Sequence, residues 1–149
     1  MSAFVAEPQL AETVDALLAP RPILIIEDDE SIAEVLSIRL EQQGYGAHIA
    51  HSGVRGLELA QSISPQLVLL DLQLPDMDGL AVCQQLDENP ATVAIPKIIL
   101  SGRDGGDIIR RSRAAGCQFY VRKPYDPNAL LVLIQQAIRD AFEAEADFA

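Results

Sequence analysis

Cysteine is scarce in this sequence, and several signals of secretion or membrane insertion are missing. The chain has 2 cysteines in 149 residues, which is too few for the disulfide frameworks of small secreted proteins. No apolar run approaches the roughly 20 residues that a membrane-spanning helix needs, and the first residues lack the basic-then-apolar order of a signal peptide. We therefore expect a cytoplasmic protein that makes no contact with a membrane.

Positive charge is also scarce. The 11 lysines and arginines face 22 aspartates and glutamates, which gives a net charge of −11. Such a surface cannot neutralise many phosphates, so we predict no direct nucleic-acid binding. The single basic cluster, residues 110–113, reads more readily as a solvated helix face than as a binding patch. A nucleotide site is also disfavoured, because no glycine-rich phosphate loop follows a predicted strand.

Short apolar runs alternate with longer segments of helical period, five times over. Runs of this length, rich in Ile, Val and Leu, are typical of buried strands. The alternation predicts an α/β domain with a parallel sheet covered by helices on both faces. The predicted strands are Ile23–Ile26, Ala47–Ala50, Leu67–Leu70, Ile98–Leu100 and Phe119–Val121.

The helical segments differ in the strength of their apolar face. In the first, Ile32, Val35, Leu36 and Leu40 share one face, and Gly44 ends the helix. Residues 104–115 form the weakest predicted helix. The other helical faces are marked by Val54, Leu57 and Ile63, by Leu80, Cys83 and Leu86, and by Leu130, Leu133, Ile134, Ala137, Ile138 and Ala141.

The two ends of the chain fall outside this alternation. In the extension of residues 1–21, Leu10, Val14, Leu17 and Leu18 recur at helical spacing between Pro8 and Pro20. They predict a short amphipathic helix whose apolar stripe packs on the domain; otherwise it mediates self-association or is loose. The main domain is expected over residues 22–142 and an acidic, frayed tail over 143–149. Since no second domain follows, we expect output through protein contact, or a place within a longer regulator.

Charged and polar residues follow four of the predicted strands. Glu27 and Asp28 end the first, Asp71 ends the third, Ser101 ends the fourth and Lys123 follows the fifth. Ligands of parallel sheets bind beyond the carboxyl ends of the strands, so these side chains should meet at one edge if the first and third strands are neighbours. A cluster of acids repels itself unless it is solvated or binds a cation.

The chemistry of this group favours a hard divalent ion. Mg²⁺ prefers about six oxygen ligands, of which Asp28, Asp71 and a backbone carbonyl can supply three and water the rest. A carboxylate at the rim of an apolar wall, beside a cation, can act as a nucleophile toward a phosphoryl group. Lys123 would offset charge on the transferring oxygens, and the Ser101 hydroxyl could donate to one of them. Asp29 and Glu30 more readily cap the first helix than bind metal.

These segments resemble the receiver domain of two-component response regulators. The resemblance rests on the segments ILIIEDDE (residues 23–30), LVLLDLQLPDMDGL (67–80), KIILSG (97–102) and AAGCQFYVRKPY (114–125), in this order and spacing. It covers about Ile23 to Ala141. It implies a flavodoxin-like (βα)5 fold, a doubly wound five-stranded parallel sheet in the order 2-1-3-4-5, with the N-terminal helix as an addition.

The resemblance also implies roles at matched positions. Asp71 would be the phosphoacceptor, receiving its phosphoryl group from a histidine kinase or a phosphotransfer protein, and Lys123 would contact that group. Mg²⁺ would be bound directly by Asp28 and Asp71, by the backbone carbonyl of Gln73, and through water by Glu27. Pro75 and Gly79 would shape the loop after Asp71, and the Lys123–Pro124 bond would be cis.

A signalling switch follows from the same resemblance. Ser101 would be the switch hydroxyl and Tyr120 the switch aromatic residue. The face formed by residues 104–125 and the last helix would bind a downstream target or output domain, or form a homodimer. Such a protein is a phosphoprotein in a phosphorelay rather than an enzyme, with only self-phosphorylation and self-dephosphorylation chemistry.

Two other functions stay open at this point. The domain could be an unphosphorylated docking module that keeps the receiver fold. It could also be a Mg²⁺-dependent phosphatase with an aspartyl-phosphate intermediate, although such enzymes use a second acid two residues after the nucleophile, where this chain has Gln73.

Overall fold

A computed structural model describes residues 21–148 of the chain. The helix predicted near residues 10–18 lies outside the described residues. In the part that is described, no helix combines the length and the apolar composition needed to cross a bilayer.

The sheet has the predicted composition and order. All pairings are parallel, and the strand order is β2-β1-β3-β4-β5. The predicted strands are therefore confirmed, with small extensions at the ends of the last three. Their bounds are β1 (Ile23–Ile26), β2 (Ala47–Ala50), β3 (Leu67–Asp71), β4 (Lys97–Ser101) and β5 (Phe119–Arg122).

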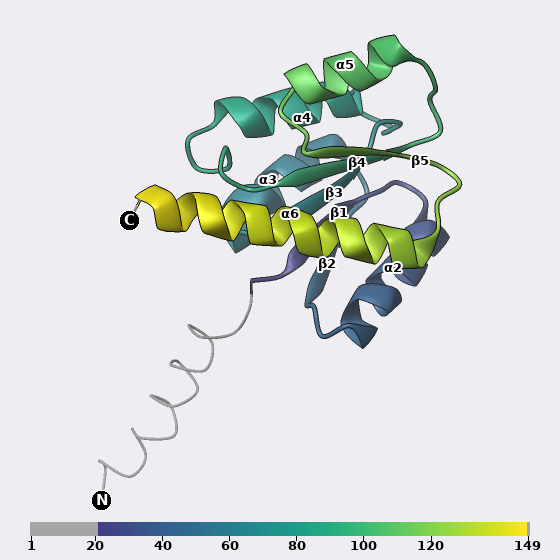
Figure 1. Ribbon diagram of the computed structural model, residues 1–149. Helices are drawn as coiled ribbons and strands as arrows, with labels where there is room; N and C mark the ends of the chain where they lie inside the picture. Colours follow the sequence, from purple (N-terminus) through teal and green to yellow (C-terminus); the bar gives the residue numbers. More distant parts are fainter. Residues whose placement is uncertain (1–20, 149) are drawn as a thin grey trace, which may run out of the picture.

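Helices cover both faces of the sheet (Figure 1). One buried cluster joins the sheet to α2 and α6, and another joins the opposite face to α3, α4 and α5. Strands buried on both faces read as continuous apolar runs, which explains the composition of β1 and β3. The helices are α2 (Glu30–Gln42), α3 (Gly53–Ile63), α4 (Gly79–Glu88), α5 (Gly106–Ala114) and α6 (Pro127–Phe148).

The residues of helix α2 that face the core differ in part from the apolar face marked in the sequence. Ala33, Leu36 and Leu40 are its buried residues, whereas Ile32 is 43% exposed and Val35 is 58% exposed. Ile32 and Val35 instead line an apolar groove between α2 and the start of α6. Of the four residues that share an apolar face in the sequence, only Leu36 and Leu40 are therefore buried.

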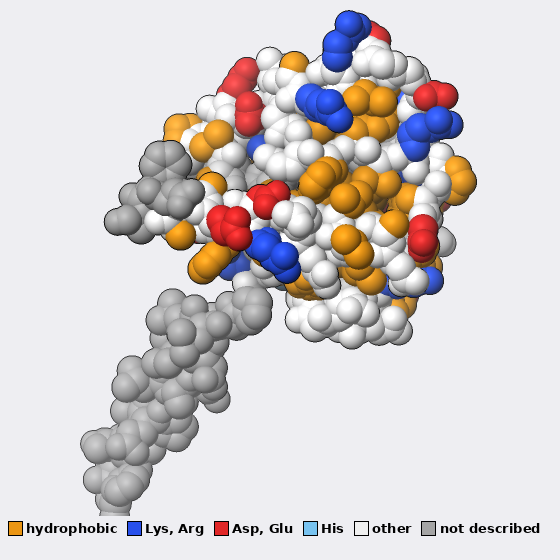
Figure 2. Space-filling view, viewed as in Figure 1, with side chains coloured by type: hydrophobic (Ala, Val, Ile, Leu, Met, Phe, Trp, Pro, Cys, Tyr) orange, Lys and Arg blue, Asp and Glu red, His pale blue; other side chains and the backbone are white. Residues whose placement is uncertain are grey.

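Helix α6 runs to Phe148, so residues 143–148 are helical where a frayed tail was expected. The alanines and glutamates of this segment are strong helix formers. At about 1.5 Å per residue the helix is roughly 33 Å long, about twice the length of the strands. Its last turns therefore extend past the sheet (Figure 1), and hydrophobic side chains lie on the surface along it (Figure 2).

The loop after β3 is packed tightly against the start of α4. A Cβ atom added to Gly79 would lie 2.5 Å from the carbonyl oxygen of Asp71 and 2.5 Å from the Cα of Leu72. The Gly79 N–H also donates to the Leu72 carbonyl at 2.9 Å. Only glycine allows this close approach of two backbone segments.

We predict that Gly79→Ala lowers the free energy of unfolding by about 2 kcal/mol or more, because the contacted atoms are backbone and cannot move aside. Gly102→Ala is the matched control: a Cβ there meets nothing within 4 Å, so its effect should stay within about 0.5 kcal/mol. Chemical denaturation of both variants measures the difference. Equal stability of the two would contradict the packing described here.

Candidate functional site

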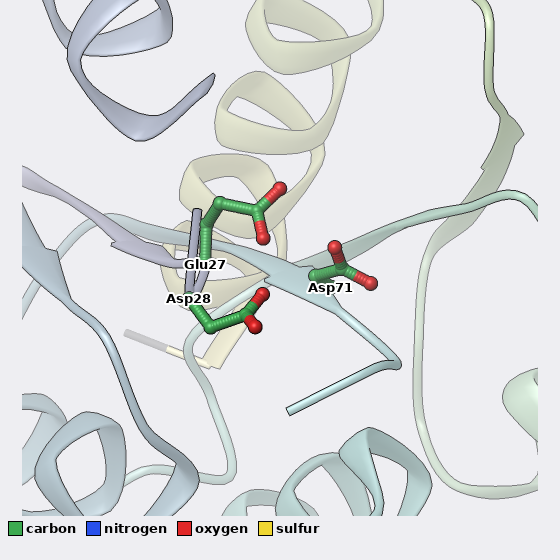
Figure 3. A group of neighbouring side chains, drawn as sticks. All are labelled: Glu27, Asp28 and Asp71. Atoms are coloured by element: carbon green, nitrogen blue, oxygen red, sulfur yellow. The ribbon is translucent and has the colours of Figure 1, made fainter. Parts of the chain in front are cut away.

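The ends of β1 and β3 bring three acids together. Ile26 pairs with Leu70, so the residues that follow each strand are neighbours. One carboxylate oxygen from each of Glu27, Asp28 and Asp71 lies within 4.8 Å of the other two, and the side chains converge on one small region beyond the strands (Figure 3). The convergence expected from the sequence is confirmed by this geometry.

Lys123 enters the same site from the end of β5. Its Nζ donates to Asp71 Oδ2 at 2.8 Å and to Glu27 Oε1 at 3.1 Å. Its backbone N–H donates to the Ser101 carbonyl at 2.8 Å, which fixes the residue against β4. The Lys123–Pro124 peptide bond is cis, as the resemblance implied.

Burial decides the electrostatics of these groups. Glu27 is 4% exposed, and its removal from water raises the pKa of its carboxyl to about 7, with a further rise from the neighbouring Asp71 and a decrease from Lys123. Burial by itself would lower the pKa of Lys123, but its bonds to Asp71 and Glu27 raise that pKa above the usual value. The ammonium group therefore stays charged and compensates the buried acids.

The loop after Asp71 is held by its own hydrogen bonds. The Gln73 N–H donates to Asp71 Oδ1 at 2.9 Å. Asp76 accepts from the Gly53 and Val54 N–H groups at 2.8 and 2.9 Å, and so caps α3 from a distant loop. Sequence reasoning missed this role of Asp76, because no local pattern links residues 22 positions apart.

Ser101 and Tyr120 are linked through one residue between them. The Arg103 N–H donates to Ser101 Oγ at 3.0 Å, and the Tyr120 hydroxyl donates to the Arg103 carbonyl at 2.8 Å. Ser101 is fully buried and Tyr120 is half-buried. An ion pair between Arg103 and Asp78, with nitrogen and oxygen 3.9 Å apart, joins this loop to the one that follows Asp71.

Other residues near the strand ends have structural roles. Asp29 caps α2 by accepting from the Ile32 N–H at 3.0 Å, as expected. The Nδ1 of His51 lies 2.9 Å from the Glu27 carbonyl, a contact that the sequence did not indicate. Burial raises the pKa of the Cys83 thiol to about 12 and that of Cys117 to about 11, so neither thiol is a reactive thiolate.

Comparison with known proteins identifies the family. The family described as the response regulator receiver domain matches residues 23–135. This chain belongs to that family. Its sheet order, its acidic cluster and its lysine are therefore those of a receiver domain.

The curated relatives that match include response regulators, and some of them are named as DNA-binding or transcriptional regulators. The "DNA-binding dual master transcriptional regulator RpaA" of Synechocystis is 37% identical over 119 residues, which are 78% of this chain and 48% of that protein. The response regulator ArlR of Staphylococcus saprophyticus is 37% identical over 117 residues, 78% of this chain and 52% of that protein. The chain thus spans about half the length of the curated relatives it matches.

Solved structures agree on the fold. A CheY-like receiver domain protein from Methanospirillum hungatei superimposes with a TM-score of 0.79 at 28% identity, over 84% of this chain and 98% of that chain. The receiver fold expected from the sequence is confirmed.

The receiver site fits a hard divalent cation. Glu27 and Asp71 share the Lys123 ammonium group, and the Asp28 carboxylate lies beside them without a bond to it. The group of three acids therefore carries excess negative charge that oxygen-preferring ions such as Mg²⁺ would compensate. Receiver domains bind Mg²⁺ at an acidic pocket of this kind.

An apolar groove lies beside the receiver site. It has a volume of about 300 Å³ and is lined by residues of α2 and the start of α6, including Ile32, Val35 and Leu130. Its lining shares Ile32, Leu36 and Tyr125 with a small hollow that reaches Asp71 and Lys123. The groove lined by α2 thus adjoins a hollow that reaches the Asp71 carboxylate.

The raised pKa of Glu27 predicts a pH-dependent stability of the metal-free domain. The folded state binds this proton more tightly than the unfolded chain, so the contribution of Glu27 to the free energy of unfolding falls as pH rises from 4.5 to about 7. Glu27→Gln removes this effect. Between pH 4.5 and pH 8, the free energy of unfolding of the variant should rise by about 1–3 kcal/mol relative to that of the native chain.

Urea denaturation across that pH range, with chelator present, measures the difference. Lys123 does not interfere, because its own contribution is lost only when pH rises above the ordinary lysine range. Glu34→Gln, which removes an exposed acid on α2, is the control. A pH-independent difference between the Glu27 variant and the native chain would contradict the buried acid.

Proposed function

We propose that Asp71 accepts a phosphoryl group from a histidine kinase or a phosphotransfer protein in a Mg²⁺-dependent reaction. One observation supports this most directly: the Asp71 carboxylate lies 2.8 Å from the Lys123 ammonium and within 4.8 Å of the oxygens of Glu27 and Asp28. A carboxylate placed between an ammonium group and other acids is arranged for phosphoryl transfer, which depends mostly on positioning and electrostatics.

In this reaction a carboxylate oxygen of Asp71 forms a bond to phosphorus. The bond between phosphorus and the donor's histidine nitrogen breaks, and the electron pair stays on that nitrogen. Lys123 contacts a phosphoryl oxygen and offsets its charge. Mg²⁺, held by Asp28, Asp71 and the Gln73 carbonyl and through water by Glu27, would supply further positive charge. Attack by water on the aspartyl phosphate returns the free carboxylate.

The contacts around Ser101 support a switch. Its Oγ accepts one hydrogen bond from Arg103 and keeps its own hydrogen for a phosphoryl oxygen. Because Arg103 also accepts from Tyr120, a shift of Ser101 toward the phosphoryl group moves the loop before α5 and the aromatic ring with it. The face of α5, β5 and α6 then changes shape.

The partners follow from this arrangement. The groove beside the site, which leads to Asp71 through Ile32 and Tyr125, gives the phosphodonor protein an apolar contact surface. The switching face of α5, β5 and α6 binds a downstream protein target or output domain, or a second copy. The domain itself does not bind nucleic acid, and its location is cytoplasmic.

Two alternatives have less support. A docking module has no need of the acids and the lysine, and all of them meet in one site. A phosphatase needs a general acid two residues after Asp71, where Gln73 is exposed and its backbone N–H bonds Asp71. The family is one of signalling proteins rather than catalysts.

The first test is labelling with acetyl phosphate. In the presence of Mg²⁺ the native chain should gain one phosphoryl group, and Asp71→Asn should gain none, because the nucleophilic oxygen is replaced by an amide. Intact-mass spectrometry measures the incorporation. Asp140→Asn, which alters an exposed acid on α6, should label like the native chain, and labelling of the Asp71 variant would remove the assignment.

The second test separates a metal ligand from its neighbour. Asp28→Asn should weaken Mg²⁺ binding by at least about tenfold, seen as loss of the stabilisation that Mg²⁺ gives in thermal unfolding. Asp29→Asn keeps a good helix cap, so its response to Mg²⁺ should be native. If the native chain shows no response to Mg²⁺, the docking-module alternative is favoured instead.

A further inference from the structure

The overhanging end of α6 bounds a hollow at the edge of the sheet opposite to Asp71. The hollow has a volume of about 200 Å³, and Pro96, Ile138, Ala141 and Phe142 are among its lining residues. Phe142 is 71% exposed. In the space-filling view, hydrophobic side chains lie beside the C-terminal half of α6, near the point where the described chain begins (Figure 2).

Two segments that lie outside the family match meet at this hollow. The family match covers residues 23–135, so the N-terminal residues and the last turns of α6 both lie outside the matched range. Arg21 and Phe142 line the same hollow. The Arg21 carbonyl accepts a hydrogen bond from the Gln66 side chain, which holds Arg21 beside the hollow.

The sequence before Arg21 carries an apolar stripe that could cover the apolar side of the hollow, which Ile138, Ala141 and Phe142 line, whereas Arg21, Gln66 and Glu145 are polar lining residues. Leu10, Val14, Leu17 and Leu18 lie on one face at helical spacing, and the acids Glu12 and Asp15 fall on the other side. Leu18 is three residues from Arg21, a span of at most about 11 Å. A helix that ends at Leu18 must therefore end beside the hollow.

We propose that residues 10–18 form an amphipathic helix that docks on the overhang of α6, with its apolar stripe over Ile138, Ala141 and Phe142. The docked helix covers Phe142 and keeps this surface from associating with other molecules. It occupies the edge of the sheet away from the phosphoacceptor site. The docking is therefore independent of the chemistry proposed at Asp71.

The test compares two neighbouring substitutions in the full chain. Leu17→Asp places a charge on the stripe, and Ala16→Asp places the same charge off the stripe. Hydrogen exchange of the α6 amides from Ile138 to Glu145 should become about tenfold faster or more in the Leu17 variant, and stay native in the Ala16 variant. Equal exchange in the two variants would overturn the proposal.

A direct contact is checked by nuclear magnetic resonance on the full chain. Methyl groups of Val14 or Leu17 should show nuclear Overhauser effects to the Phe142 ring, and Phe142→Asp should release the segment as Leu17→Asp does. Val132→Asp, at a position 63% exposed on the same helix, should not. Absence of these effects overturns the proposal.

Two further measurements identify the occupant and keep the two proposals apart. A mixture of isotope-labelled and unlabelled chains separates contacts within one chain from contacts between chains. Nuclear Overhauser effects between different copies would show that a second molecule fills the hollow, and this result would overturn docking within one chain. Acetyl phosphate labelling should be native in both the Leu17 and the Ala16 variants. A Leu17 variant that loses docking but is still phosphorylated like the native chain would show that the docking does not depend on the function proposed for Asp71.

Discussion

Two carboxylates, Glu27 and Asp71, share the ammonium group of Lys123 at the end of an otherwise apolar sheet. Without that ammonium the pKa of the buried Glu27 would rise further, and Asp71 would lose its contact with Lys123. The hydrogen bond from the Lys123 backbone to the Ser101 carbonyl holds this residue beside the end of β4. The position of β5 relative to β1 and β3 therefore has a chemical consequence at Asp71.

The charge at this site is only partly balanced. The described site holds three carboxylates and one ammonium group. A divalent cation would offset the charge of the acids. A phosphoryl group would add negative charge, which the cation and Lys123 would offset together. The hydrogen bonds that join Ser101, Arg103 and Tyr120 connect that balance to the surface of α5 and β5. In the proposed switch, these bonds would carry a change of charge at Asp71 to that surface.

The strands, and the positions of the polar residues at their ends, were predictable because their signals are local and repeated. Buried parallel strands leave continuous apolar runs, and the groups that act at a strand end follow those runs directly, as Asp71 follows Leu70. The prediction was weakest where an element has more than one apolar face. Helix α2 buries Ala33 and exposes Val35, because the closeness of helix and sheet decides which stripe fits, and α6 continues where its acidic composition suggested an end.

The sequence by itself determined the order of strands and helices and the residues that stand at the strand ends, since period, apolar runs and turn residues are properties of neighbouring positions. Only the tertiary structure decided which distant groups meet. Asp76 caps α3 across 22 positions, and Lys97, a charged residue, is fully buried with its Nζ 3.7 Å from Asp87. Such pairings depend on how the layers pack, and packing sets burial, pKa and contact in three dimensions.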